Sequence, residues 1–260
     1  MKKTFLVCSL AGRMDGVFKL VSSLREFGND WNMVMVLQKY PAEERAIIES
    51  HVRAIFGDKG AVISMSEMTG PHVARCAAFD LYDSDVWCIL DDDMWAVPGF
   101  TDYDRMAEIV FSRKDIGLLS ANWRRNESML RAVTLNNKLL KQDIVYTGGG
   151  MMFRREVADI IKAIPRVMYV FDNPLWSIYS FVNGYDNYRY MGCAAVHNIC
   201  TKGGRIKWLK ENDKAKRLPP AEWIVTRRGT GKAGSNNEYL ICDSKDITPL
   251  ARELHERNKK

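Results

Sequence analysis

The sequence predicts an α/β fold built on a mostly parallel central sheet. Short apolar runs alternate with amphipathic, helix-like segments through the first half of the chain. Strands that alternate with helices are joined by right-handed crossovers, which give a parallel sheet with helices on both faces. The fourth apolar run ends in three consecutive aspartates. Because ligands bind beyond the carboxyl ends of such strands, we expect the functional site at this end of the sheet.

The first half of the chain contains four predicted strands and three predicted helices. The strands are expected at residues 4–10, 32–37, 61–65 and 86–90, and the helices at residues 16–27, 41–56 and 71–82. In the first helix, Val17, Leu20, Val21 and Leu24 recur at helical spacing and form one apolar face. Pro41 is suited to the first turn of the second helix.

The second half of the chain is less regular. Strands are expected at residues 116–121 and 193–198, helices at 155–164 and 174–184, and a glycine-rich segment at 146–153. From Lys202 onward the pattern weakens into a polar, basic stretch that contains paired glycines and prolines. We therefore predict one domain over residues 1–201. A basic C-terminal extension over residues 202–260 is expected to pack on the functional site or to close over it.

The composition fits one soluble globular domain. The chain has 260 residues, of which 47% are hydrophobic and 27% are charged, and this length is enough for one core. No apolar run approaches the roughly 18 residues that span a bilayer, so no transmembrane segment is expected. The start of the chain mimics a signal peptide. Arg13 and Asp15 interrupt its apolar run early, which favours a buried first strand.

The six cysteines show no CxxC pair and no regular spacing. Most of them lie in apolar stretches, where a free thiol behaves as a small hydrophobic group. This pattern favours a reducing compartment over a disulfide framework, and it makes a zinc site unexpected. We therefore expect the protein in the cytoplasm, or in the host cytoplasm if the protein is viral.

The net charge of +6 is concentrated at one end of the chain. Residues 201–260 carry 15 Lys and Arg against 8 Asp and Glu, whereas residues 1–200 carry 23 against 24. Trp208 and Trp223 lie among these cations. Because cations neutralise phosphates and aromatic rings stack on bases, the stretch is suited to nucleic acid. A loop that closes over a diphosphate, a contact with an anionic membrane surface and a solvated tail are the alternatives.

Asp91, Asp92 and Asp93 are the residues most informative about function. They directly follow an uncharged apolar strand. Three adjacent carboxylates repel one another, and a divalent cation removes that repulsion. With strand-like alternation, Asp91 and Asp93 point to one side and Asp92 points elsewhere. Hard oxygen ligands suit Mg²⁺ or Mn²⁺, which keep positions open for phosphate oxygens. The alternative is a solvated acidic loop that caps a helix.

Six short segments occur along the chain in a defined order. They are AGR at residues 11–13, GPHVAR at 70–75, DDD at 91–93, GGGMMFRR at 148–155, FDNPLWS at 171–177 and VHN at 196–198. Together they resemble the GT-A glycosyltransferases, especially those of family 2, over roughly residues 4–200. The resemblance implies a GT-A type three-layer sandwich, with residues 1–201 as its catalytic domain. It also implies transfer of a hexosyl or pentosyl group from a UDP- or GDP-type nucleotide sugar, with Mn²⁺ or Mg²⁺ as cofactor.

The resemblance assigns the aspartates and one histidine to the donor and its metal. Asp91 and Asp93 match the DxD motif. Asp91 is expected near the ribose or a metal-bound water, and Asp93 is expected to ligate the metal directly. Asp92, between them, is included in the expected donor site. His197 is expected to complete the metal ligands, and a core or surface histidine with its hydrogen bonds satisfied is the alternative.

Three further charged residues are expected around the nucleotide. Arg13 and Asp15 follow the first strand, where the resembled enzymes hold the nucleotide. Arg75 matches a basic position that flanks the donor, and a cation beside a diphosphate is electrostatically favourable. Ordinary surface charge is the alternative for both arginines.

Asp172 is the expected general base. A sugar hydroxyl is a poor nucleophile, so an inverting transferase needs a base near the anomeric carbon. Asp172 matches the acidic position of the family's ED-type motif. Asn173 stands where a second acid is common, and this departure leaves inversion open. A helix cap is the alternative role for Asp172.

The acceptor site is expected near the glycine-rich segment. Gly149 and Gly150 let the backbone approach a ligand closely, and Trp176 offers a stacking surface; a tight turn and a core position are the alternatives. The basic residues expected on the donor diphosphate or on nucleic acid are Lys202, Arg205 and Lys207. Two acceptors are considered. One is a hydroxymethylated base of phage DNA, flipped into the site. The other is a saccharide or a lipid-linked saccharide.

Other functions explain less of the same pattern. A nucleotidyltransferase also places carboxylates and Mg²⁺ at a strand end, but residues 9–16 lack the glycine-rich basic loop that is typical of those enzymes. No GxGxxG motif follows a strand, which argues against a Rossmann dehydrogenase. A basic nucleic-acid-binding protein explains the C-terminal charge and leaves the aspartates unexplained. The sequence gives no prediction of the oligomeric state.

Overall fold

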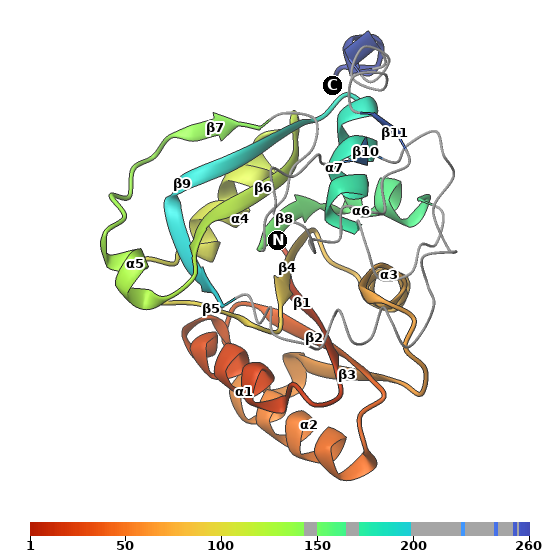
Figure 1. Ribbon diagram of the computed structural model, residues 1–260, viewed down its shortest axis with the longest axis vertical. Helices are drawn as coiled ribbons and strands as arrows, with labels where there is room; N and C mark the ends of the chain where they lie inside the picture. Colours follow the sequence, from red (N-terminus) through yellow and green to blue (C-terminus); the bar gives the residue numbers. More distant parts are fainter. Residues whose placement is uncertain (143–149, 165–171, 199–224, 227–241, 244–251, 254) are drawn as a thin grey trace.

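The structure is a computed structural model that describes residues 1–142, 150–164, 172–198, 225–226, 242–243, 252–253 and 255–260. A curled sheet lies between two layers of helices (Figure 1). The predicted α/β three-layer sandwich with a mostly parallel sheet is confirmed. The predicted boundary between residues 201 and 202 falls outside the described residues and stays a prediction.

The first four strands form the parallel half of the sheet. They are β1 (Lys3–Leu10), β2 (Asn32–Gln38), β3 (Gly60–Met65) and β4 (Val86–Asp91). They lie in the order β3-β2-β1-β4, and each coincides with a predicted strand to within one residue at either end. β1 pairs in parallel with both β2 and β4, so that Cys8 lies opposite Asp91. Because helices cover both faces of these strands, their sequences are almost continuously apolar.

β8 (Met151–Arg154) runs against its neighbours in the second half of the sheet. It pairs antiparallel with β4 and with β6 (Ile116–Arg124). β9 (Asp186–His197) then pairs in parallel with β6. Two short strands, β5 (Met94–Trp95) and β7 (Leu139–Lys141), pair antiparallel with β9. Six of the nine strands of this sheet therefore run in one direction.

β9 is longer than the strand predicted at residues 193–198. Its first residues are polar, and side-chain hydrogen bonds allow them to be buried. Oδ1 of Asn187 accepts a hydrogen bond from the amide of Leu118, and its Nδ2 donates to the carbonyl of Ser177. A polar side chain that is satisfied in this way can occupy a buried strand. Hydropathy does not reveal such partners, and for this reason the prediction missed the first half of β9.

Helices cover both faces of the sheet (Figure 1). On one face the core includes residues of α1 (Met14–Ser23), α2 (Ala42–Phe56) and α4 (Tyr103–Ser112). On the other face it includes residues of α3 (Pro71–Leu81), α6 (Arg155–Lys162) and α7 (Asp172–Val182). The short α5 (Glu127–Arg131) contacts β6 and β9. A separate parallel pair is formed by β10 (Val225–Thr226) and β11 (Cys242–Asp243).

Several helices differ from the prediction, among them the short α5, which was not predicted. The first helix begins at Met14 and gives way after Ser23 to a 3₁₀ turn at Arg25–Phe27. Pro41 precedes α2 with ψ at 151° instead of occupying its first turn. α4 was not predicted at all. Its buried residues nevertheless recur at positions i, i+3, i+4 and i+7 counted from Tyr103, which is the spacing of an amphipathic helix.

The last residues of the chain pack against the turn between α7 and β9. The imidazole of His255 stacks on Phe181 with 4.1 Å between the ring centroids, and its Nδ1 lies 2.9 Å from the carbonyl oxygen of Phe181. The amide of Lys260 donates to the carbonyl of Gly184. Gly184 has φ of 87°, and a Cβ there would lie 1.7 Å from the backbone oxygen of Asn258. The position therefore requires glycine.

None of the described helices has both the length and the apolar character that crossing a bilayer requires. Of the described cysteines, Cys76, Cys88 and Cys193 are buried and Cys8 is partly exposed.

Arg154, the last residue of β8, is buried and holds the end of α4. Its guanidinium donates to the backbone carbonyls of Val110, Arg113 and Lys114. We expect Arg154→Leu to lower the free energy of unfolding by about 2–4 kcal/mol, because three carbonyls lose a charged donor. Urea unfolding followed by circular dichroism measures this change.

Arg155→Leu is the matched control for that measurement. Arg155 is half-exposed and pairs with Asp83 at the surface. Exposed ion pairs contribute little to stability, so the free energy of unfolding is expected to change by less than about 1 kcal/mol. Equal losses in the two variants would contradict the structural role given to Arg154.

Candidate active site

The three aspartates lie at the carboxyl end of β4 and in the turn that follows it. β4 ends at Asp91, the chain turns through the next two residues, and β5 begins at Met94. β5 pairs with the end of β9, with Met94 opposite His197. The amide of Asn198 also donates to the carbonyl of Asp93 over 2.9 Å. This pairing brings a histidine that is distant in sequence next to the aspartates.

Asp91, Asp93 and His197 place three potential metal ligands around one point. Nε2 of His197 lies 3.5 Å from Oδ2 of Asp91 and 3.2 Å from Oδ1 of Asp93. One ligand atom from each residue lies within 4.8 Å of the other two. Two hard carboxylate oxygens with one imidazole nitrogen suit a divalent cation such as Mn²⁺. The residues present therefore fit the cofactor that the sequence predicts.

His197 is largely buried beside the two carboxylates. Burial by itself lowers the pKa of the imidazole, but the hydrogen bond to Asp93 and the charges of Asp91 and Asp93 outweigh burial and raise the pKa. The ring of Trp123 packs edge-on against the imidazole, with 5.5 Å between the centroids. Nδ1 of His197 is buried without a hydrogen-bond partner among the described residues. Nε2 is therefore the nitrogen that serves this site.

Two arginines orient the carboxylates of this group. Nη2 of Arg75 lies 2.8 Å from Oδ1 of Asp91, and Nη2 of Arg13 lies 3.1 Å from Oδ2 of Asp93. Each contact occupies one oxygen of its carboxylate, and the other oxygen faces His197. The guanidinium charges also offset part of the repulsion between the aspartates. The site is thus built so that one oxygen from each aspartate faces the same point.

Asp92 is turned into the protein and is only 2% exposed. Its Oδ1 pairs with Nη1 of Arg13 at 2.8 Å, and its Oδ2 accepts a hydrogen bond of 2.6 Å from Oγ of Ser9. Burial raises the pKa of Asp92 to about 7, although Arg13 and Ser9 oppose the shift. In this structure both carboxylate oxygens of Asp92 are directed to Arg13 and Ser9, and donor binding by Asp92 stays a prediction.

The model of glycosyl transferase family 2 matches residues 15–161, which is more than half of the chain. The protein belongs to glycosyl transferase family 2. This membership confirms the resemblance that the order of motifs indicates. No curated protein sequence matches this family 2 member.

Solved glycosyltransferase structures share the fold of this family 2 protein. Residues 1–349 of S. aureus TarS are 14% identical with a TM-score of 0.59, and the match covers 75% of this chain and 60% of that one. Mannosyltransferase PcManGT from Pyrobaculum calidifontis is 14% identical with a TM-score of 0.60, over 83% and 62% of the two chains. GalNAc-T7 is 11% identical with a TM-score of 0.61, over 76% and 44%. The chain therefore spans less than two thirds of each of these chains, and the likeness shows the fold alone.

The other predicted site residues of the family 2 protein lie in different surroundings. Asp15 is exposed in the first turn of α1. Gly150 has φ of 68° directly before β8, and a Cβ there would lie 3.0 Å from Met94, so the turn requires glycine. Asp172 is the first residue of α7. The predicted site residues outside the described part of the chain are Gly149, Lys202, Arg205 and Lys207.

Trp176 is a core residue of this family 2 protein. It is completely buried, and its Nε1 donates to Nδ1 of His72 over 2.9 Å. The rings of Phe79 and Phe153 pack against it, and the guanidinium of Arg75 lies 5.6 Å from its ring centroid. The indole is not exposed in this structure, and the acceptor contact of Trp176 stays a prediction. Trp176 supports Arg75.

Ser9 and Tyr40 belong to the site and were missed in the sequence. Oγ of Ser9 lies 2.8 Å from the hydroxyl of Tyr40 and also donates to Asp92. Burial raises the pKa of Tyr40 to about 12, so the phenol stays neutral. A signal was available, because Ser9 is a polar residue that follows the apolar run at residues 5–8 of β1, and the neighbouring strand ends at Asp91.

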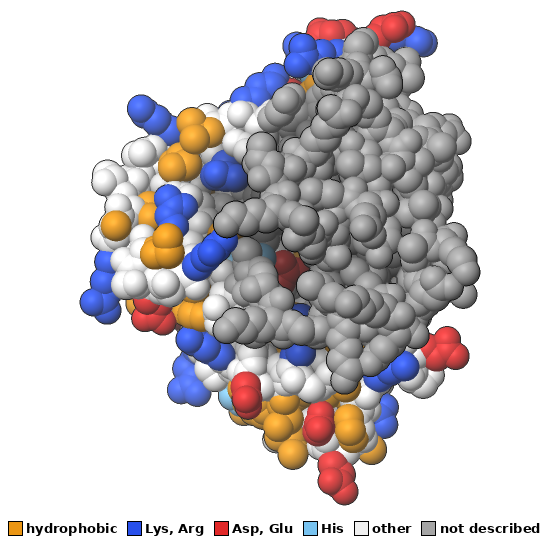
Figure 2. All heavy atoms as spheres, viewed as in Figure 1, with side chains coloured by type: hydrophobic (Ala, Val, Ile, Leu, Met, Phe, Trp, Pro, Cys, Tyr) orange, Lys and Arg blue, Asp and Glu red, His pale blue; other side chains and the backbone are white. Residues whose placement is uncertain are grey.

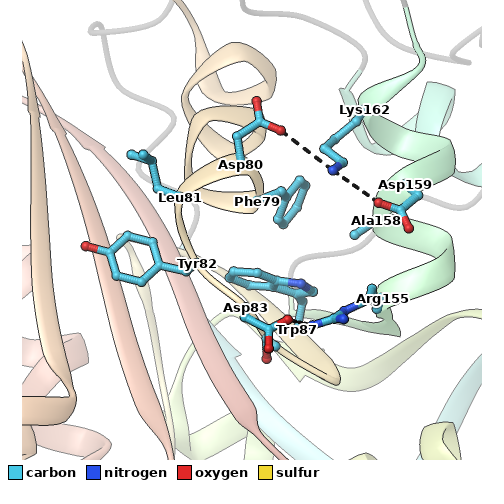
Figure 3. Close-up of a pocket in the computed structure, with 11 residues that line it drawn as sticks. Phe79, Asp80, Leu81, Tyr82, Asp83, Trp87, Arg155, Ala158, Asp159 and Lys162 are labelled. Atoms are coloured by element: carbon cyan, nitrogen blue, oxygen red, sulfur yellow. Dashed lines mark ion pairs between the residues drawn. The ribbon is translucent and has the colours of Figure 1, made fainter.

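A pocket of about 470 Å³ lies near the other end of β4, between α3 and α6 (Figure 3). Phe79 and Trp87 form part of its apolar lining. Its charged side chains pair with one another, since Nζ of Lys162 lies 3.1 Å from Asp159 and 3.6 Å from Asp80. We assign this pocket no part in the chemistry, because the aspartates that follow β4 lie at the opposite end of that strand.

We expect the wild-type protein to bind one Mn²⁺ at the aspartate site. His197→Ala is expected to weaken this binding by roughly 10-fold or more, because one of three protein ligands is lost. Isothermal titration calorimetry with Mn²⁺ alone measures the affinity. His51→Ala is the control, since His51 lies on α2 and its side chain contacts Ser22 and Phe18, not the aspartates. An unchanged affinity in His197→Ala would contradict the assignment of this ligand.

Proposed function

We propose that the chain transfers a sugar from a UDP- or GDP-type nucleotide sugar to an acceptor hydroxyl, in a reaction that depends on Mn²⁺ or Mg²⁺. The observation that carries this proposal is the convergence of Asp91, Asp93 and His197 at the carboxyl end of β4. Ligands of α/β sheets bind at this end, and such a site keeps positions open for phosphate oxygens. Membership of family 2 makes sugar transfer a better explanation than nucleotidyl transfer or nucleic-acid binding alone.

The ligands of the solved structures are of the proposed kind. One TarS structure contains UDP-GlcNAc. The PcManGT structure contains GDP-Man and Mn²⁺, and the GalNAc-T7 structure contains UDP, GalNAc and Mn²⁺. These ligands belong to proteins that are 11–14% identical to this chain. They support a nucleotide sugar and a divalent cation as classes, and we propose no particular sugar.

The proposed roles follow from where each charged group lies. A divalent cation held by Asp91, Asp93 and His197 supplies Lewis-acid stabilisation for the charge that develops on the leaving nucleoside diphosphate. Arg75 is buried and holds one oxygen of Asp91. Arg13 holds one oxygen of Asp93 and is more than a third exposed, so its charge also lies beside the proposed diphosphate. The exposed start of α1, where Asp15 lies, is proposed to flank the nucleotide.

Asp172 is the proposed general base of an inverting transfer. It is the first residue of α7, a helix that contacts β6 and β9. A base in this role takes the proton from the acceptor hydroxyl while the hydroxyl oxygen bonds to the anomeric carbon and the bond to the diphosphate breaks. Support comes from the match of residues 171–177 to the family's ED-type motif, in which Asn173 replaces the second acid.

The proposed acceptor is a hydroxymethylated DNA base or a saccharide, including a lipid-linked one. Lys and Arg side chains gather over the side of the molecule that carries α5 and β7 (Figure 2). The exposed cations described there include Arg125, Arg131 and Lys138. These charges have the same sign as the excess in residues 201–260, and both favour a polyanionic acceptor. Gly149 and Gly150 are proposed to lie on the acceptor side, and a cytoplasmic location is proposed for the enzyme.

We expect one class of nucleotide sugar to raise the Tm of the wild-type protein only when Mn²⁺ or Mg²⁺ is present. A thermal-shift panel of UDP- and GDP-sugars, with metal or with EDTA, measures this. Asp93→Ala is expected to abolish both the metal-dependent shift and sugar transfer, because a ligand of the cation is lost. Asp58→Ala removes an exposed carboxylate beyond α2 and serves as the control. Donor binding and turnover that persist in EDTA would contradict the proposed metal dependence.

The donor that stabilises the protein is then offered to two acceptors side by side, hydroxymethylated DNA and a panel of saccharides. Transfer to DNA that falls steeply as salt increases supports the polyanionic acceptor, because phosphate contacts release counterions. Transfer to saccharides alone, with no dependence on salt, eliminates DNA as the acceptor.

Asp172→Asn is expected to lower kcat by roughly 10²–10⁴-fold, because the variant cannot accept the proton of the acceptor hydroxyl. The affinity for the nucleotide sugar with Mn²⁺ is expected to stay unchanged. Steady-state kinetics and the thermal shift measure these two quantities on the same preparation. Asn173→Ala keeps the proposed base and is expected to retain most of the turnover. A wild-type kcat in Asp172→Asn would eliminate this residue as the base.

A further inference from the structure

Arg13 joins two of the three aspartates. It is the residue immediately before α1, and its guanidinium reaches the turn between β4 and β5. Nη1 lies 2.8 Å from Oδ1 of Asp92, and Nη2 lies 3.1 Å from Oδ2 of Asp93. A planar guanidinium with fixed donor directions can span two carboxylates in this way, whereas an ammonium group is a single point of charge. Arg13 is therefore placed to hold one oxygen of the Asp93 carboxylate.

The two oxygens of Asp93 are used differently. Oδ2 is held by Arg13, and Oδ1 lies 3.2 Å from Nε2 of His197, within the group of potential metal ligands. Hydrogen bonds to the second oxygen of a ligating carboxylate fix its orientation, and they affect metal affinity without touching the metal. Arg13 is placed to act in this manner on Asp93.

Asp92 is the carboxylate of this group whose position is fixed by burial and a hydrogen bond. It is buried, and Oγ of Ser9 on β1 donates a hydrogen bond of 2.6 Å to its carboxylate. The backbone around it is also confined, because a Cβ on Gly16 of α1 would lie 2.6 Å from the carbonyl oxygen of Asp92. The start of α1 thus packs directly on the aspartate turn. Arg13 is consequently held at two points. Its guanidinium pairs with the buried Asp92, and its backbone leads into α1, which packs closely on the backbone of Asp92.

We propose that Asp92 and Arg13 are positioning residues for the metal ligand Asp93. Asp92 fixes Arg13, and Arg13 turns the Asp93 carboxylate so that Oδ1 faces Asp91 and His197. This inference rests on the proposed function, because it requires a cation at that point. It differs from the expectation that Asp92 binds the donor, since Asp92 acts here through Arg13 and touches neither cation nor nucleotide.

The first test distinguishes the effect of the guanidinium geometry of Arg13 from the effect of its positive charge. Arg13→Lys keeps the positive charge and cannot bridge two carboxylates, so Mn²⁺ affinity is expected to fall by roughly 10- to 100-fold. Titration calorimetry with Mn²⁺ alone measures the affinity, and the Mn²⁺ electron paramagnetic resonance spectrum is expected to broaden as the ligand geometry becomes less uniform. If Arg13 acted only through its charge, the variant would bind Mn²⁺ like the wild type, and this result would overturn the proposal.

A second variant tests whether Asp92 affects Mn²⁺ binding through Arg13. Asp92→Asn is expected to weaken Mn²⁺ binding as well, and the double variant is expected to bind no more weakly than the weaker single variant. If the fold-losses of Mn²⁺ affinity in the two single variants multiply in the double variant, Asp92 and Arg13 act independently. That result would overturn the proposed action of Asp92 through Arg13. Asp115→Asn is the matched control, because it breaks another arginine–aspartate pair, with Arg113, without touching the aspartate site. Its Mn²⁺ affinity is expected to equal that of the wild type.

The outcomes also distinguish this inference from the proposed function. A wild-type protein that binds no Mn²⁺ would overturn both of them. A wild-type protein that binds Mn²⁺, with an Arg13→Lys variant of equal affinity, would overturn the positioning role alone. Thermal unfolding of each variant confirms that the fold is intact, since Arg13→Lys leaves a cation beside the buried Asp92 and avoids an unpaired buried charge.

Discussion

Repulsion among three consecutive carboxylates is the constraint on which the rest of the site depends. Asp91 ends the buried strand β4, Asp92 is buried, and Asp93 is only partly exposed, so solvent screens their charges incompletely. In the structure, each of the three carboxylates is paired with an arginine. Arg75 takes an oxygen of Asp91, and Arg13 takes one oxygen from each of the other two. The oxygens that remain on Asp91 and Asp93 point to one place beside His197, where a divalent cation would complete the neutralisation.

The two arginines differ in how firmly they are held. Arg75 is 2% exposed on α3 and lies over the indole of Trp176, so its position is set by the core. Arg13 is more than a third exposed, and its guanidinium pairs with Asp92 and Asp93. The first arginine is therefore part of the rigid framework. The second can both orient Asp93 and present charge to a diphosphate, which is the property that a donor site requires.

The hydrophobic pattern predicted the strands that bury apolar side chains. It did not predict the segments whose polar side chains are buried through hydrogen bonds to other elements. β1 to β4 were predicted because both of their faces are covered. The polar start of β9 was missed, since Asn187 is buried through hydrogen bonds to distant backbone groups. The grouping of Asp91 and Asp93 with His197 was predicted from the order of motifs. The inward turn of Asp92 toward Ser9, and the burial of Trp176 beneath His72, depend on contacts between separate elements that no local pattern reports.

The most direct test of this account is a crystal structure of the protein with Mn²⁺ and the nucleotide sugar that stabilises it. Anomalous scattering at the manganese edge locates the ion. The account predicts one peak at bonding distance, about 2–2.5 Å, from oxygens of Asp91 and Asp93 and from Nε2 of His197, with diphosphate oxygens in the remaining positions. A diphosphate and its metal bound elsewhere on the protein, with the three side chains still facing one another, would contradict it.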